Sequence, residues 1–138
     1  MHEFTTKRKV EFADTDMCGI VHFSRFAIFM ETAEHEFLSA LGTSVVLVHD
    51  DVHIGWPRVA VSVEYNSPAR FGDVLDIHVR VLRKGTKSMT YGFEFERDGE
   101  SIARGQVTAV CCQLGRDGVI SGIEIPSFIA DKIEQAPR

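Results

Sequence analysis

Two carboxylates lie close together near the amino terminus, just before a segment with helical spacing. Asp14 and Asp16 flank Thr15, and Gly19 stands between them and the expected helix. A helix amino terminus exposes unpaired N–H groups and partial positive charge, which favour anions and developing oxyanions. A carboxylate beside it could attack a carbonyl carbon or activate water. The alternative is that both acids only form a turn or cap the helix, as Asp often does.

Two histidines are also spaced in a way that could bind a metal. His49 and His53 lie four residues apart, but the segment between them is not H-E-x-x-H and no third ligand is evident. The stretch also lies beside Gly55 and Pro57, which favour a loop. No metal site is therefore predicted.

The elements that must position these residues are visible in the hydrophobic pattern. Residues 7–12 predict a first strand and residues 13–23 a loop. Apolar residues recur at helical spacing over about residues 24–41, and Gly42 follows as a stop. Period-two alternation predicts four more strands, at about residues 59–65, 75–81, 89–95 and 101–114. The polar stretch up to Pro57 is expected to be a loop, and a short helix is expected from Pro126.

This order of elements predicts the architecture. The strands are linked by short turns such as Asp98-Gly99, so neighbouring strands are antiparallel. One apolar helix and one antiparallel sheet bury each other best when the sheet curls around the helix. We therefore expect an α+β fold forming a single domain over residues 1–138. The unprotected sheet edges predict pairing with a second copy, as a homodimer or homotetramer.

One motif resembles a known family. The segment Asp14-Thr15-Asp16-x-x-Gly19-x-Val21, followed by Phe26 and Glu31, resembles the signature of the 4-hydroxybenzoyl-CoA thioesterase family of hot-dog proteins. The segment 68–75 is similar to the turn after the family's second strand. The resemblance covers nearly the whole chain. It implies a hot-dog fold, a five-stranded antiparallel sheet wrapped around one long central helix, and hydrolysis of acyl-CoA thioesters.

The resemblance also implies roles for individual residues. Asp16 would be the nucleophile or general base, and Gly19 belongs to the same motif. Backbone N–H groups near His22 and Phe23 would polarise the thioester carbonyl. The family commonly carries Tyr or Trp where this chain has His22, which leaves the substrate shape open. Glu31, the family's helix acid, is the second candidate base, although a solvated or interface carboxylate is the ordinary interpretation.

Thioester hydrolysis needs only these few groups, because a thiol with a pKa of about 8.5 departs as its thiolate without strong acid assistance. The region 80–87 could hold the phosphates of coenzyme A, since it carries four cations and no acid. A solvated hairpin tip is an equally good interpretation. The residues predicted to bind coenzyme A are Arg83, Lys84, Lys87 and Ser88. Coenzyme A is part of the substrate, and no separate cofactor is expected.

Composition argues against several classes of partner and location. The net charge of −5 argues against a nucleic-acid partner. No apolar run is long enough to span a bilayer, and residues 1–12 lack a secretory signal. The cysteines (Cys18, Cys111 and Cys112) are odd in number, and two are adjacent, so no disulfide framework is expected and a cytoplasmic location is favoured. Cys18 has no Cys-His-acid order to mark it as a nucleophile.

Two other functions remain open. A hot-dog hydratase or dehydratase would pair a histidine with an acid, and His22 could serve, but H-F-P-G and D-x-N-P-x-H motifs are absent. A non-catalytic acyl-CoA-binding module would need no acid at Asp16. The acyl group itself is not determined, because aromatic and short or medium aliphatic acyl groups both fit the pattern.

Overall fold

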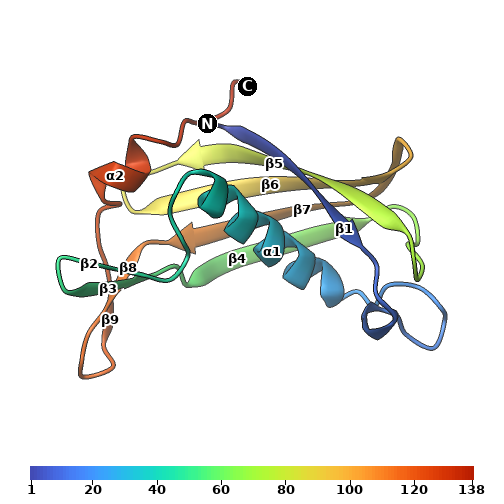
Figure 1. Cartoon of the computed structure of the whole chain (residues 1–138), viewed down its shortest axis with the longest axis horizontal. Coiled ribbons are helices and arrows are strands. Elements are labelled where there is room, and N and C mark those ends of the chain that lie inside the picture. The colour runs from blue at the N-terminus through green and yellow to red at the C-terminus, as the bar shows by residue number, and fades with distance from the viewer.

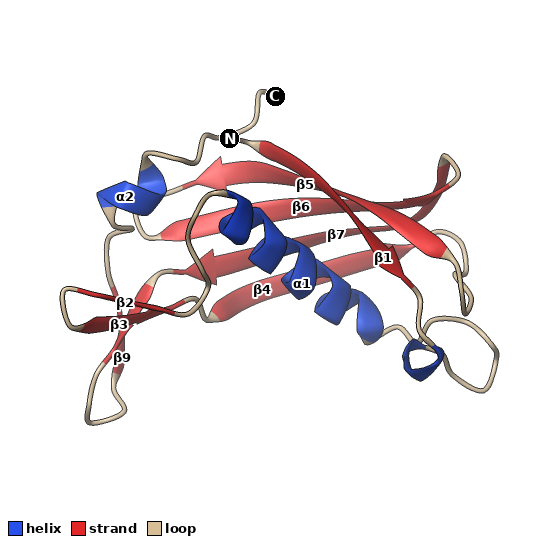
Figure 2. Cartoon of the chain, viewed as in Figure 1, coloured by secondary structure: helices blue, strands red, loops and turns tan.

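The computed structural model describes residues 1–138 and contains a five-stranded antiparallel sheet that curls around one long helix (Figure 1). The strand order is β1-β5-β6-β7-β4, and the helix α1 (Arg25–Ala40) lies across the concave face (Figure 2). The strands of this sheet are β1 (Glu3–Lys9), β4 (Arg58–Tyr65), β5 (Val74–Lys84), β6 (Ser88–Arg97) and β7 (Glu100–Val110).

The helix forms because its apolar residues gather on one side. Phe26, Phe29 and Phe37 are all buried, and the helix ends before Gly42, which adopts a positive φ of 81°. Gly105 on β7 allows the helix to lie close to the sheet, because a side chain there would overlap the Met30 sulfur. The helix predicted at about residues 24–41 is therefore confirmed, starting one residue later and ending one residue earlier.

The first strand was predicted too late in the chain. It runs over residues 3–9, and residues 12–14 form one 3-10 turn, η1 (Phe12–Asp14). The regular pairing stops at Val10, which is fully buried. Its N–H donates to the Asp73 carbonyl at 2.8 Å, but its carbonyl accepts from the Gly72 N–H at 3.0 Å and not from Asp73. The alternation that predicted a strand over residues 7–12 therefore spans a strand end and a turn.

The stretch predicted as a loop before Pro57 contains a hairpin, so that prediction is wrong. It holds β2 (Leu47–His49) and β3 (Val52–Gly55), joined through Asp50 and Asp51, both with positive φ. The long final strand is also interrupted at Cys111 and continues as β8 (Cys112–Leu114) and then β9 (Ile120–Gly122). These four short strands make a second sheet in the order β2-β3-β8-β9.

The remaining element is α2 (Ser127–Ala130), the short helix expected after Pro126. It lies at the end of the main sheet where β5 ends and β6 begins (Figure 1). None of the helices has the length and apolarity needed to cross a membrane.

Candidate active site

Asp16 lies in a tight loop between η1 and α1. Its Oδ1 accepts a hydrogen bond from the Cys18 N–H at 2.8 Å, and its main chain bonds to Gly19 and Ile20 at 3.0 and 2.9 Å. Gly19 has a φ of 77°, a conformation that a side chain would disfavour. These contacts fix the carboxylate while leaving Oδ2 without a protein partner.

An open cleft of roughly 540 Å³ lies in front of this carboxylate. Its floor is largely apolar, which suits the exclusion of water from a reacting group. Asp16 and Phe23 come from the loop, Phe26 from the first turn of α1, and Tyr65 from the end of β4. The other lining residues are Ile20, Val21, Asn66, Ser67, Pro68 and Ala69.

Phe23 lines this cleft and has a main-chain donor that is not used within the protein. The Phe23 N–H has no acceptor within the protein, whereas the His22 N–H donates to the Asp14 carbonyl at 2.9 Å. Of the two N–H groups expected to polarise a carbonyl, the one at His22 is therefore already occupied. The Phe23 carbonyl accepts the Tyr65 hydroxyl at 3.0 Å, which ties the loop to β4. Tyr65 carries no motif that would have marked it in the sequence.

The side chain of His22 does not line the cleft. Its Nδ1 lies 2.8 Å from the Ser24 hydroxyl, and its ring packs on Phe23 with centroids 4.5 Å apart. His22 thus shapes the start of the helix and holds the Phe23 ring.

Asp14 has a different environment from Asp16. It is 3% exposed and accepts a hydrogen bond from the Glu11 N–H at 2.8 Å. The guanidinium groups of Arg8 and Arg25 lie 3.7 and 3.8 Å away. Asp14 therefore links β1, η1 and the start of α1, and it is Asp16 that faces the open cleft.

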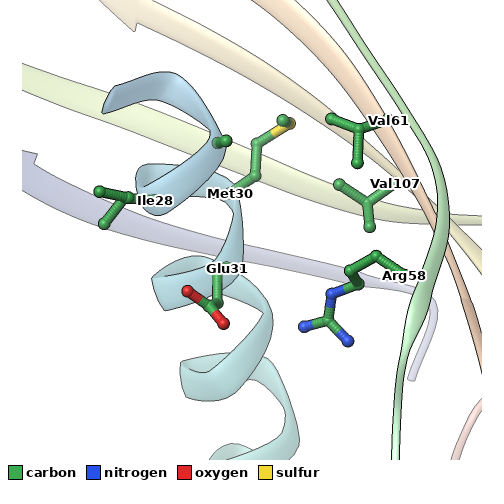
Figure 3. A pocket seen from close by; sticks show the side chains of 7 residues that line it. Ile28, Met30, Glu31, Arg58, Val61 and Val107 are labelled. Carbon is green, nitrogen blue, oxygen red and sulfur yellow. The ribbon is translucent and has the colours of Figure 1, made fainter. Parts of the chain in front are cut away.

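Glu31 lies away from Asp16, in a second pocket between α1 and β4 (Figure 3). Its side chain is 55% exposed, and the Nε2 of His35 lies 3.9 Å from its carboxylate. The structure does not bring the two candidate acids into one site. The second pocket also contains Arg58, which no motif in the sequence had singled out.

Glu34 is a buried acid that sequence reasoning did not assign to a site. It is 1% exposed, and its Oε2 accepts a hydrogen bond from Arg58 Nη2 at 2.6 Å. Burial raises the pKa of the Glu34 carboxyl to about 7, although the Arg58 charge opposes this and the Glu31 charge adds to it. The available signal was its position at the edge of the apolar stripe of α1.

The predicted coenzyme A residues lie at the other end of the sheet from the Asp16 loop, around the β5–β6 turn beside α2 (Figure 1). Arg83 and Lys87 are exposed, and the Ser88 carbonyl closes the turn by accepting the Gly85 N–H at 2.8 Å. Lys84 differs, because its ammonium group donates to the carbonyls of Ala130 and Ile133 at 2.6 and 2.9 Å. Lys84 anchors the carboxyl-terminal segment rather than standing free for a phosphate.

Known proteins share this architecture. Residues 10–133 match the model of the Thioesterase-like superfamily, and the chain belongs to this family. A 1,4-dihydroxy-2-naphthoyl-CoA hydrolase of Synechocystis sp. is 28% identical over 116 residues, covering 83% of this chain and 84% of that protein. A gentisyl-coenzyme A thioesterase structure has a TM-score of 0.80 and 25% identity, and the match covers 94% of this chain and 98% of that one.

A third comparison concerns the fold alone. The 4-hydroxybenzoyl-CoA thioesterase of Pseudomonas sp. strain CBS-3 has a TM-score of 0.82 at 19% identity, covering 95% of this chain and 99% of that one. The resemblance and the α+β hot-dog fold predicted from the sequence are confirmed. The predicted class, a thioester hydrolase, is confirmed as well.

Proposed function

We propose that this chain hydrolyses an acyl-CoA thioester in the cleft in front of α1, with Asp16 as nucleophile or general base. One observation carries the proposal. The free Oδ2 of Asp16 and the unpartnered Phe23 N–H belong to residues that line the same cleft, at the amino terminus of the only long helix. These are the two functions that acyl transfer requires, a base or nucleophile and an oxyanion donor.

The reaction proceeds by attack on the thioester carbonyl carbon, either by the Asp16 carboxylate or by a water that passes its proton to it. The carbonyl oxygen becomes an oxyanion and accepts the Phe23 N–H, while the α1 terminus adds its partial positive charge. The carbon–sulfur bond then breaks and coenzyme A leaves as a thiolate. Direct attack gives an acyl anhydride of Asp16, which water hydrolyses to the free acid.

We infer that the acyl group is aromatic. Relatives named for the substrate they hydrolyse act on 1,4-dihydroxy-2-naphthoyl-CoA and gentisyl-coenzyme A, which supports this class. The phenyl rings of Phe23, Phe26 and Tyr65 around the cleft support it too. A relative from Haemophilus influenzae, 21% identical, is named only as an acyl-CoA thioesterase, so aliphatic esters are the competing class.

We propose further that the working form is a homo-oligomer in which one copy contributes coenzyme A contacts to another. The two edges of the main sheet differ. β1 carries Lys7, Arg8 and Lys9, whereas β4 exposes Val59 and Val61 at 63% and 53%. Charged edges resist pairing and apolar ones invite it. The position of Arg83 and Lys87 at the far end of the sheet supports their serving the cleft of another copy.

No observation favours a hydratase. That chemistry would need a histidine in the cleft beside an acid, and the His22 ring bonds to Ser24 outside the lining residues.

The experiment is the release of free thiol from a panel of acyl-CoA esters, with aromatic, short aliphatic and medium aliphatic members. The proposal predicts turnover of at least one ester and a higher kcat/KM for aromatic members. A folded protein that binds the esters yet releases no thiol from any of them would contradict it. Loss of the double bond of crotonyl-CoA without thiol release would indicate a hydratase instead.

A further inference from the structure

Residues 67–69 form one wall of the Asp16 cleft. They belong to the connection between β4 and β5, which contains no helix or strand, so its position depends on the bonds that its polar groups make. Pro68 has no N–H, and its carbonyl accepts one hydrogen bond, from the Nη1 of Arg97 at 3.1 Å. A side chain from another element therefore holds the middle of this wall.

Arg97 is the last residue of β6 and bonds to three acceptors at once. Its Nη1 donates to the Asp73 carboxylate at 2.8 Å as well as to the Pro68 carbonyl, and its Nη2 donates to Glu100 at 3.0 Å. The other carboxylate oxygen of Glu100 accepts the Ser67 hydroxyl at 3.0 Å. One guanidinium thus ties both ends of the connection between β4 and β5 to the turn between β6 and β7.

Both carboxylates around Arg97 are ionised at neutral pH. The Arg70 N–H lowers the pKa of the Asp73 carboxyl most, burial opposes it, and Arg97 lowers it further. The Ser67 hydroxyl lowers the pKa of the Glu100 carboxyl most, and Arg97 adds to that effect. The guanidinium of Arg97 therefore lies between two anions, and its planar fork of donors is fixed in orientation by all three acceptors.

The same wall is bonded to the loop that carries Asp16. Ala69 is 1% exposed, and its carbonyl accepts the Val21 N–H at 2.8 Å. The Ile20 carbonyl, directly before Val21, accepts the Asp16 N–H at 2.9 Å. Hydrogen bonds therefore join the wall that Arg97 holds to the main chain of Asp16.

We propose that Arg97 is a positioning residue for the hydrolysis, because it holds the wall that keeps the Asp16 carboxylate in place for the chemical step. Arg97 does not line the cleft, so it acts through the wall and not on the substrate. A chemical step is sensitive to such support, since a displacement of about 1 Å can cost about 100-fold in rate. The inference rests on the proposed function, which assigns the reaction to Asp16.

The experiment measures kcat and KM of Arg97→Met on the best ester of the panel, at a temperature below the melting point of the variant. Methionine keeps an apolar stem and removes every donor. We expect kcat to fall about 10- to 100-fold and KM to stay within about threefold, because Asp16 acts in the chemical step. Arg104→Met is the matched control, since Arg104 on the adjacent strand β7 pairs with Glu94 at 2.9 Å and has no bond to the cleft wall. Its kcat should equal that of the wild-type protein.

A second readout separates positioning from a role in stability alone. In the Asp16→Asn background, Arg97→Met should change the residual kcat by less than about twofold, because the group that it positions is gone. A role in stability alone would lower the melting temperature and leave the kcat of the folded protein unchanged. A folded Arg97→Met protein with kcat within about threefold of wild type, or a loss of equal size in both backgrounds, overturns the inference.

Arg97→Lys replaces Arg97→Met if the latter does not fold. Lysine keeps the positive charge between the two carboxylates but has no planar fork for the three acceptors, so kcat should fall at least about threefold. A kcat equal to that of the wild-type protein in folded Arg97→Lys overturns the inference and leaves the thioesterase intact. A wild-type protein that releases no thiol from any ester of the panel overturns the proposed function as well.

Discussion

The two carboxylates near the amino terminus, Asp14 and Asp16, have different surroundings. Asp16 lines the cleft, and its carboxylate is held by the Cys18 N–H through one oxygen and has no protein partner at the other, whereas Asp14 is buried between Arg8 and Arg25. The sequence motif placed both acids before the helix. The motif could not show that Asp14 is buried, because the burial of Asp14 depends on β1, which brings Arg8 beside the loop.

The buried carboxyl of Glu34 should make the stability of the protein depend on pH. Its pKa is about 7 in the folded protein and 4.5 as a free side chain, so the folded state binds more protons between those values. The contribution of Glu34 to the free energy of unfolding is therefore full below about pH 4.5 and is lost as pH rises through about 7. Burial raises this pKa most, the Arg58 charge lowers it, and the Glu31 charge raises it further. At about 1.4 kcal/mol per pKa unit, the loss is on the order of 3 kcal/mol.

Urea unfolding between pH 4.5 and 8 measures this effect, with Glu34→Gln as the comparison. The difference in unfolding free energy between Glu34→Gln and the wild-type protein should grow in favour of the variant as pH rises through 7. A difference that stays constant across the range would mean that Glu34 has the same pKa in the folded and unfolded states.

At the scale of elements, the cleft depends on how β4 meets the start of α1. The Tyr65 hydroxyl donates to the Phe23 carbonyl and so orients the peptide group between Phe23 and Ser24. This group is the next along the chain after the one that carries the free Phe23 N–H. Tyr65→Phe removes one partly exposed hydrogen bond, typically about 1 kcal/mol, and leaves the ring in place. We expect kcat to fall about 3- to 10-fold with KM and thermal stability nearly unchanged.

The measurement is steady-state kinetics on the best ester of the panel, with a melting curve for each protein. Asn66→Ala is the matched control, because it removes a polar side chain of the same cleft that bonds to Ser101 instead. Equal kcat for Tyr65→Phe and the wild-type protein would mean that the Phe23 peptide is oriented without Tyr65.

The main elements were predictable because each has a strong local signal. The apolar stripe from Phe26 to Phe37 predicts α1, and strict alternation from Leu75 to Val81 predicts β5. The second sheet was missed because β2 and β3 are three and four residues long and turn on two aspartates with positive φ, where glycine or asparagine is the usual signal. The Glu34–Arg58 pair was missed because its partners are 24 residues apart and meet only in the folded chain.

At the scale of the whole molecule, the apolar edge strand predicts assembly. Val59 is 63% exposed on β4 and lines none of the pockets described above. Val59→Lys should therefore weaken pairing with a second copy without altering the Asp16 cleft. We expect light scattering to give a multiple of the chain mass for the wild-type protein and a smaller assembly for the variant. Thr5→Lys on the charged edge should leave the mass unchanged. A wild-type monomer at micromolar concentration would refute the proposed assembly.

The coenzyme A contacts can be tested on the same assembly. Arg83→Glu with Lys87→Glu should raise KM several-fold with little change in kcat, because phosphate contacts bind the ground and transition states alike. The rise should shrink at high salt as the charges are screened. The matched control reverses Lys7 and Lys9 on β1. An unchanged KM in the Arg83, Lys87 variant would place the coenzyme A site elsewhere.

We propose that the Asp16 carboxylate performs the chemical step in this cleft. Asp16→Asn keeps the size of the side chain and an oxygen for the Cys18 N–H but removes the negative charge. Loss of a general base typically costs about 10²–10⁴-fold, so kcat on the best ester should fall by that order while the ester still binds. Asp14→Asn should act mainly on stability, and Glu31→Gln should leave the chemical step intact. A folded Asp16→Asn protein with kcat within about threefold of wild type would contradict the claim, since that is well short of a general-base loss.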